Sequence, residues 1–135
     1  GFDPKIIATY SHADIQRLMQ DTGIVRNRLK IESAIHNARM VLEIIQEHGS
    51  FSSYLWRYVN NTPRQIAWTS MSELPAQTEQ SDMMSKDLKK LGFKFVGSTI
   101  CYALMQSVGM VNDHVVGCFR YAEVRDRAAI ISAGL

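Results

Sequence analysis

Apolar residues recur at three- and four-residue steps through residues 26–48, and this stripe constrains the fold more than any other feature. Residues spaced in this way share one face of an α-helix, so the spacing predicts one long helix from about Arg26 to His48. Gly49 follows, where a glycine commonly ends a helix. We expect the buried face to consist of Leu29, Ala34, Ile35, Ala38, Leu42 and Ile45.

Similar spacing on both sides predicts an all-α fold. Ser11 and Asp14 have the spacing of a capping box, which predicts a short helix after Ser11. No segment shows the two-residue alternation of a half-buried strand, and residues 64–77 are expected to form a long connection. The stretch after Tyr121 fits a peripheral helix or a frayed tail. Other helices are expected over about 12–20, 51–59, 79–91 and 98–108, the last with Ile100, Leu104, Met105 and Val108 as its buried stripe.

The composition is that of an ordinary globular protein. The chain has 135 residues, the size of one domain, of which 46% are apolar and 21% charged. No apolar run is long enough to span a bilayer. Two cysteines do not suggest a disulfide framework, so we expect a reducing, cytoplasmic setting. The net charge of +2 permits an acidic partner without arguing for one.

A short glycine turn separates the first two predicted helices of substantial length. Asp21, Thr22 and Gly23 end the first, and basic residues follow in the next turn, as in a helix-hairpin-helix DNA-binding element. Gly23 permits a backbone conformation that other residues resist, and the free N–H groups of the following helix can hold a phosphate. The candidate DNA-binding residues are Thr22, Gly23, Val25, Arg26 and Lys30, with Arg28 adding positive charge nearby.

An ordinary helical turn with solvated charges accounts for the same residues. The usual hairpin also has a second glycine two residues after the first, and this chain has Val25 there. Spacing alone therefore leaves both interpretations open.

His114 and Cys118 stand four residues apart, as two metal ligands on one face of a helical turn would. A structural zinc needs about four Cys or His ligands, and the remaining Cys and His residues do not pair at ligand spacing. Either the rest of a zinc site lies outside these residues, or the pair is not a metal site. Packing in the core is the alternative, because Cys is among the most buried residue types.

Several segments resemble the DNA-3-methyladenine glycosylase I family. GFKFVGSTICY (92–102) and VNDHVVGC (111–118) resemble the C-terminal signature of that family. DTGIVR (21–26), with Lys30 and Ile31, resembles its hairpin segment, in which a bulky aliphatic residue is common at the position of Val25. The likeness runs collinearly from about Phe2 to Tyr121.

The resemblance implies a base-excision repair enzyme that acts on alkylated double-stranded DNA. Such an enzyme flips 3-methyladenine out of the duplex and hydrolyses its N-glycosidic bond without nicking the strand. It also implies a helix-hairpin-helix glycosylase-like helical bundle over residues 1–121, followed by a tail over 122–135. We expect a monomer that has no membrane partner.

The resemblance further implies that His114 and Cys118 hold half of a structural zinc site. The other two ligands, and the glutamate and aromatic residues that recognise the base, belong in the family to an N-terminal segment that nothing here matches. The sequence does not decide whether that segment is disordered, cleaved or on another chain. We therefore expect an incomplete bundle, assign no catalytic residue, and expect little or no glycosylase activity from this chain alone.

Two other functions remain open at this point. The first is a non-catalytic helix-hairpin-helix DNA-binding module, which needs the hairpin and no base pocket. The second is a helical interaction domain that binds no nucleic acid.

Overall fold

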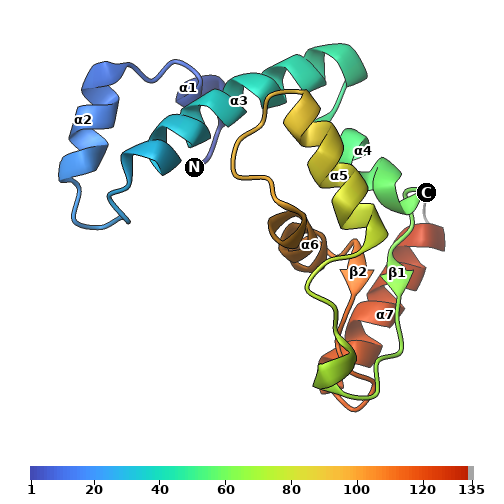
Figure 1. The fold of residues 1–135 in the computed structure, drawn as a ribbon. Helices are drawn as coiled ribbons and strands as arrows, with labels where there is room; N and C mark the ends of the chain where they lie inside the picture. The colour runs from blue at the N-terminus through green and yellow to red at the C-terminus, as the bar shows by residue number, and fades with distance from the viewer. Residues whose placement is uncertain (134–135) are drawn as a thin grey trace. The chain divides into compact units, whose positions relative to one another are not determined.

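The computed structural model describes residues 1–133, and the chain forms two compact units. One contains residues 1–54 and 87–96, and the other contains residues 55–86 and those from 97 onward. More than half of the described residues lie in α-helices, which confirms the all-α prediction. The elements in Figure 1 are α1 (Pro4–Ile7), α2 (His12–Gln20), α3 (Arg28–His48), α4 (Phe51–Trp56), the 3-10 helix η1 (Arg57–Val59), β1 (Arg64–Gln65), the 3-10 helix η2 (Met71–Glu73), α5 (Glu79–Lys90), α6 (Ser98–Ser107), β2 (Val111–Asn112) and α7 (Phe119–Ala133).

In the first unit, α1 and α2 pack against α3. The predicted capping box is present at the start of α2, where the backbone N–H and the hydroxyl of Ser11 both donate to Asp14 Oδ2, at 2.8 and 2.9 Å. These hydrogen bonds favour the charged carboxylate, so they hold the pKa of Asp14 below its ordinary value. The box fixes where the first helix of the hairpin begins.

Helix α3 begins two residues later than predicted. Asn27 is its N-cap, and Asn27 Oδ1 accepts the backbone N–H of Lys30 at 3.1 Å, so Arg26 lies in the turn before the helix. The end is as predicted: Gly49 closes the helix with φ of 78°, in the left-handed region that glycine tolerates best.

The predicted buried face of α3 is partly wrong. Ile35 and Ala38 are buried, but Leu29 is 66% exposed and Ala34 and Ile45 are also exposed. Leu29 lies in the first turn of α3 and continues the exposed hairpin segment, in which every residue from Asp21 to Lys30 is exposed. The buried residues of α3 are Ile31, Ser33, Ile35, Ala38 and Ile44.

The predicted buried face of α6, in the second unit, is also partly wrong. Met105 is fully buried as predicted, but Ile100 is 60% exposed and Val108 is 47% exposed. The buried line instead passes through Cys101, Tyr102 and Met105. Ile100 precedes Tyr102 by two positions, which places it on the opposite side, and Val108 lies at the C-cap.

Two other segments differ in detail from expectation. The single helix expected over 51–59 is α4 followed by the 3-10 turn η1, which ends at Asn60 and Asn61 with φ of 52° and 56°. Within the connection expected over 64–77, β1 pairs in parallel with β2, with Arg64 opposite Val111 and Gln65 opposite Asn112. Two-residue strands are too short to show any alternation in sequence, which is why the pairing was missed.

The C-terminal stretch is helical. Helix α7 runs from Phe119 to Ala133, so the predicted division between residues 121 and 122 falls inside it, and the last two residues of the predicted tail lie outside the described residues. No described helix is both long enough and apolar enough to cross a membrane.

Candidate functional site

The structure brings the predicted DNA-binding residues together in one exposed turn between α2 and α3. Every residue from Asp21 to Lys30 is exposed, and the side chain of Val25 is 77% exposed. The turn is tight, because the N–H of Asn27 donates to the carbonyl of Val25 at 2.9 Å. An apolar residue this exposed on a tight turn is available for contact with a partner.

The role of Gly23 differs from the predicted one. Gly23 does not adopt a positive φ, so the turn does not require glycine for its backbone conformation. Its N–H donates to Asp21 Oδ1 at 2.8 Å, and an added Cβ would lie only 3.1 Å from that oxygen. Glycine is favoured here because the Asp21 side chain folds closely over the turn.

Positive charge at the turn comes mainly from Arg26 and Lys30. Arg28 forms an ion pair with Glu32 across one turn of α3, at 3.4 Å, which leaves it less available to a ligand. The first backbone N–H groups of α3 have no intrahelical acceptor, and they carry the positive end of the helix dipole. This combination of free N–H groups and two cations can bind a phosphate, but it contains no group suited to chemistry on a base.

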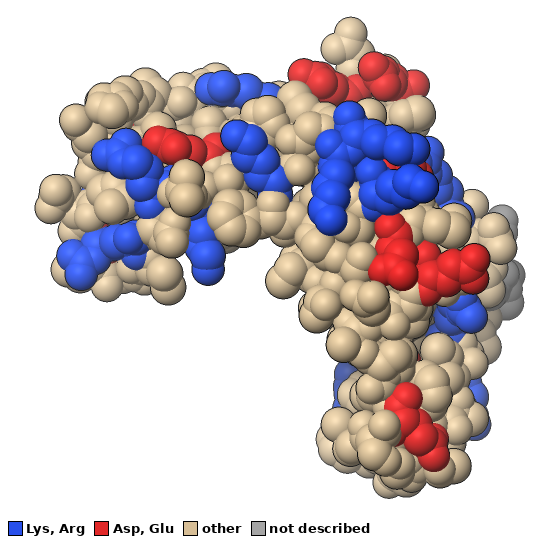
Figure 2. Space-filling view, viewed as in Figure 1, with Lys and Arg blue, Asp and Glu red and all other residues tan. Residues whose placement is uncertain are grey.

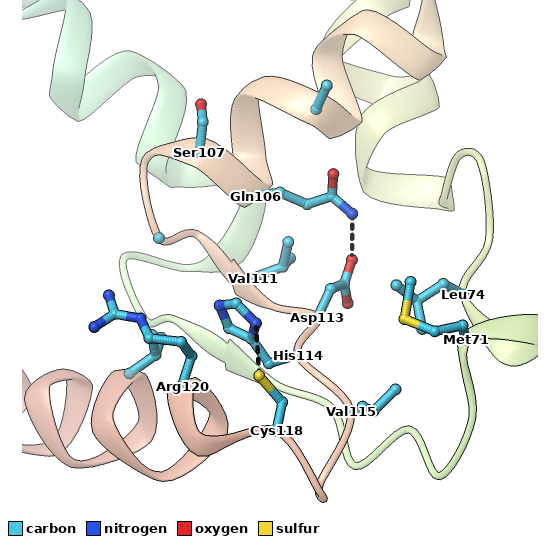
Figure 3. Close-up of a pocket in the computed structure, with 13 residues that line it drawn as sticks. Met71, Leu74, Gln106, Ser107, Val111, Asp113, His114, Val115, Cys118 and Arg120 are labelled. Carbon is cyan, nitrogen blue, oxygen red and sulfur yellow. Dashed lines mark hydrogen bonds between the residues drawn. The ribbon is translucent and has the colours of Figure 1, made fainter.

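His114 and Cys118 also lie close together, though not on a helix as predicted. They belong to the loop between β2 and α7, where the N–H of Cys118 donates to the carbonyl of Val115 at 2.8 Å. Figure 3 shows the imidazole and the thiol facing each other, and His114 Nδ1 is 3.8 Å from Cys118 Sγ. A tight turn rather than a helical turn therefore brings the pair together.

The pair fits two ligands of one zinc ion. Bond lengths of about 2.3 Å to sulfur and 2.0 Å to nitrogen, at a tetrahedral angle, put the two ligand atoms about 3.6 Å apart. The observed separation of His114 Nδ1 and Cys118 Sγ is 3.8 Å. His114 is exposed and Cys118 is half-buried, so further ligands have access. Among residues 1–133, no cluster of three or more His, Cys, Asp or Glu side chains completes the site.

A buried polar network holds this loop, and sequence reasoning missed it. Asp113 is 8% exposed, and its Oδ1 accepts the indole N–H of Trp68 at 3.0 Å. Its Oδ2 accepts the side-chain amide N–H of Gln106 at 2.8 Å (Figure 3). The carbonyl of Trp68 in turn accepts the N–H of Val116 at 2.8 Å. Trp68 therefore holds the loop through both its side chain and its backbone, which is a structural role.

Asn112 completes the network. Its side-chain amide donates to Gln65 Oε1 at 2.9 Å and to the carbonyl of Tyr121 at 3.1 Å, which links β1, β2 and α7. The signal in the sequence was two consecutive polar residues, Asn112 and Asp113, directly before His114. Their burial could not be inferred without knowing the partners.

The same unit contains an open cavity of about 680 Å³ beside the loop. Asp113, His114 and Cys118 lie on its wall, and apolar side chains supply most of the rest. Tyr102 of α6 is buried in the same unit, and its hydroxyl has no hydrogen-bond partner within the described residues. Burial first, and then the nearby Asp113 carboxylate, raise the pKa of Tyr102 above its ordinary value. The cavity is also lined by Met71, Leu74, Val111 and Arg120, which are drawn in Figure 3.

The described residues thus combine a helical fold with an exposed basic turn between α2 and α3 and, in the other unit, a His–Cys pair in a loop that a buried polar network holds. Residues 1–121 match the family model of methyladenine glycosylases, and the chain belongs to that family. This confirms the resemblance read from the sequence.

Named relatives agree with this assignment. The chain is 50% identical over 120 residues to DNA-3-methyladenine glycosylase 1 of Escherichia coli (strain K12), covering 89% of this chain and 64% of that protein. It is 42% identical over 117 residues to DNA-3-methyladenine glycosylase of Haemophilus influenzae, covering 87% of this chain and 63% of that protein. The chain thus spans a little under two thirds of the length of either relative.

Solved structures show the same fold. A crystal structure of 3-methyladenine DNA glycosylase I superimposes with a TM-score of 0.84 at 47% identity, covering 87% of this chain and 64% of that one. A 3-methyladenine DNA glycosylase I from Staphylococcus aureus, solved to explain recognition of 3-methyladenine, gives a TM-score of 0.84 at 34% identity, covering 87% and 62%.

Proposed function

We propose that this chain is part of a base-excision repair glycosylase that removes 3-methyladenine from alkylated duplex DNA by hydrolysing the N-glycosidic bond. The observation that carries the proposal is the match of residues 1–121 to the methyladenine glycosylase family, with 50% identity to a relative named for this activity. The protein would act as a monomer in a reducing, cytoplasmic compartment. The direct test is whether this chain can replace the matching residues of that relative and preserve release of 3-methyladenine.

The hairpin turn supplies the contact with the DNA backbone in this proposal. Arg26, Lys30 and the free N–H groups at the start of α3 bind phosphates, which positions the duplex without reading its sequence. Thr22, Gly23 and Val25 shape the turn and meet the same strand. The support is their joint exposure in one tight turn.

The described residues do not supply a base pocket of the kind the resemblance implies. None of the glutamates stands in the matching family motif, and chemistry on a flipped base needs a pocket that holds it. We therefore expect the 135-residue chain to bind DNA weakly and to release little or no 3-methyladenine. Robust turnover on methylated DNA, by a preparation free of any longer glycosylase, would contradict this expectation.

His114 and Cys118 supply two of four ligands to a structural zinc ion in this proposal. The support is the 3.8 Å separation of Nδ1 and Sγ, and the buried network that holds the loop. Bound zinc would cross-link chain segments and add to stability without taking part in the chemistry. A reducing compartment suits this role, because the ligand is a thiolate.

Zinc content tests the metal proposal. Two ligands cannot close a tetrahedral site, so the 135-residue chain should purify with well under one zinc per molecule. In a longer protein that holds zinc, Cys118→Ala should release the ion and lower the melting temperature, whereas Cys101→Ala should keep the ion. Retention of zinc by the Cys118→Ala protein would show that His114 and Cys118 are not the ligands.

A further inference from the structure

The loop that follows α5 is fastened to the middle of α3 by side-chain hydrogen bonds. Asn37 clamps Lys94: its Oδ1 accepts the backbone N–H of Lys94 and its Nδ2 donates to the carbonyl of Lys94, both at 2.9 Å. His36, the residue before Asn37, has its Nε2 2.8 Å from the carbonyl oxygen of Gly92. The backbone around Lys94 is therefore held in one place relative to α3.

The same loop contains unusual backbone angles that these contacts must maintain. Gly92 has φ of 93°, and Phe95 has φ of 58°, a left-handed conformation that disfavours an aromatic residue. The Phe95 side chain is 57% exposed, so its own burial does not hold the loop. Phe93 provides the anchor instead: it is buried and stacks on Phe51, with ring centroids 6.1 Å apart. Strain of this kind is most often retained where the loop has a function.

The last turn of α5 and the loop that follows it carry concentrated positive charge. Lys89, Lys90 and Lys94 are all exposed, and Figure 2 shows blue side chains gathered over α5. Lys90 lies 3.8 Å from Asp87, but neither Lys89 nor Lys94 forms an ion pair with any described residue. Lys89 and Lys94 thus present positive charge that no ion pair among the described residues neutralises, and Lys90 adds a third cation beside them.

Lys94 is anchored about two turns of α3 away from Lys30 at the hairpin. Lys30 and Asn37 are seven residues apart, which puts them on nearly the same face of the helix, about 10 Å apart along its axis. Asn37 therefore anchors Lys94 over the face that begins with Lys30 at the hairpin. About 10 Å corresponds to roughly three base steps of one DNA strand at 3.4 Å each.

We propose that Lys89, Lys90 and Lys94 form a second DNA backbone contact, which extends the hairpin contact along α3, and that Asn37 is the positioning residue of this surface. The ligand is the phosphate backbone of duplex DNA. The proposal rests on the proposed function, since it assumes that the hairpin binds the same duplex.

The salt dependence of binding to an unmodified duplex, measured by fluorescence anisotropy on the 135-residue chain, tests the proposal. Each phosphate contact contributes about 0.9 to the slope of log K against log salt concentration. Lys89→Gln combined with Lys94→Gln should lower that slope by about 2 and weaken binding severalfold. The matched control is Lys5→Gln with Arg127→Gln, two exposed cations outside the loop and the hairpin, which should leave the slope unchanged.

Two further variants distinguish failure of the second DNA contact from failure of DNA binding by the whole unit. Asn37→Ala keeps every charge but frees Lys94, so it should lower the slope by about 1 while the melting temperature is recorded as a check on folding. Arg26→Gln with Lys30→Gln reports on the hairpin alone. If the hairpin variant lowers the slope and the loop variant does not, the second contact is wrong and the proposed function stands. If neither variant changes the slope, DNA binding by this unit is wrong as well.

Discussion

At the scale of single residues, Tyr102 and Asp113 are both buried, and the Asp113 carboxylate is near enough to influence the pKa of the tyrosine. Asp113 accepts hydrogen bonds from Trp68 and Gln106, while the Tyr102 hydroxyl has no partner within the described residues. Burial and the Asp113 charge both disfavour the tyrosinate, so the pKa of Tyr102 is raised. The folded protein therefore keeps this proton at a pH where the unfolded chain releases it.

The stability of the chain should fall in alkali because of Tyr102. The stabilising preference for the protonated side chain is fully present below about pH 10, the ordinary pKa of tyrosine, and is lost as the pH rises above it. Tyr102→Phe should remove this part of the alkaline loss. At neutral pH it should also raise the free energy of unfolding by about 1 kcal/mol, because a buried hydroxyl without a partner is removed.

Urea unfolding at pH 7 and at about pH 11 measures both effects. Tyr121→Phe, at a half-buried position in α7, is the matched control and should retain the alkaline loss. A Tyr102→Phe protein that is clearly less stable at neutral pH would show that the hydroxyl has a partner, with Asp113 the first candidate.

At the scale of elements, the turn between α2 and α3 is fixed at both ends by side-chain caps. The Ser11–Asp14 box sets the start of α2, and Asn27 sets the start of α3. Between them, the Asp21 carboxylate accepts the N–H of Gly23, so the turn keeps its shape without a left-handed residue. The phosphate-binding geometry proposed for the turn depends on these three local contacts.

Gly23→Val should weaken binding to all duplex sequences by a similar factor. The new side chain would displace Asp21 Oδ1, the nearest atom at 3.1 Å, and the turn would lose its shape while the helices remain. If the disturbed turn loses one charge-assisted hydrogen bond to a phosphate, the affinity falls by about 1.5 kcal/mol, or roughly tenfold. Anisotropy with duplexes of unrelated sequence measures it.

Gly97→Val is the control for that experiment. Gly97 has an extended backbone at the N-cap of α6, and an added Cβ meets nothing within 4 Å, so binding should not change. If Gly23→Val bound duplex DNA as tightly as the parent, with its helix content preserved, the assignment of the hairpin would be wrong.

The sequence predicted where the helices occur better than it predicted which face of each helix is buried. Capping residues such as Ser11 and the glycine at 49 act locally, so their effect can be read from neighbouring residues. Which side of α3 or α6 is buried depends on distant partners, and for that reason Leu29 and Ile100 were wrongly expected in the core. The Asp113 network joins residues 45 positions apart in sequence, beyond the reach of local patterns.

At the scale of the whole molecule, the two features to which we propose functions belong to different compact units. The hairpin and the lysine loop belong to one compact unit, and the His114–Cys118 pair with its polar network belongs to the other. Both lie within the part that matches the methyladenine glycosylase family. The chain spans 64% of the Escherichia coli relative, and we propose that it supplies DNA binding and zinc ligands to the complete enzyme.

The most direct measurement is release of 3-methyladenine from methylated duplex DNA by a chimera, in which this chain replaces the 120 matching residues of the Escherichia coli relative. The parent relative and the isolated 135-residue chain are assayed beside it, and circular dichroism confirms that each protein is folded. We predict release by the chimera and by the parent, and little or none by the isolated chain. A folded chimera that binds the duplex but releases no 3-methyladenine would contradict the proposal that this chain belongs to a working 3-methyladenine glycosylase.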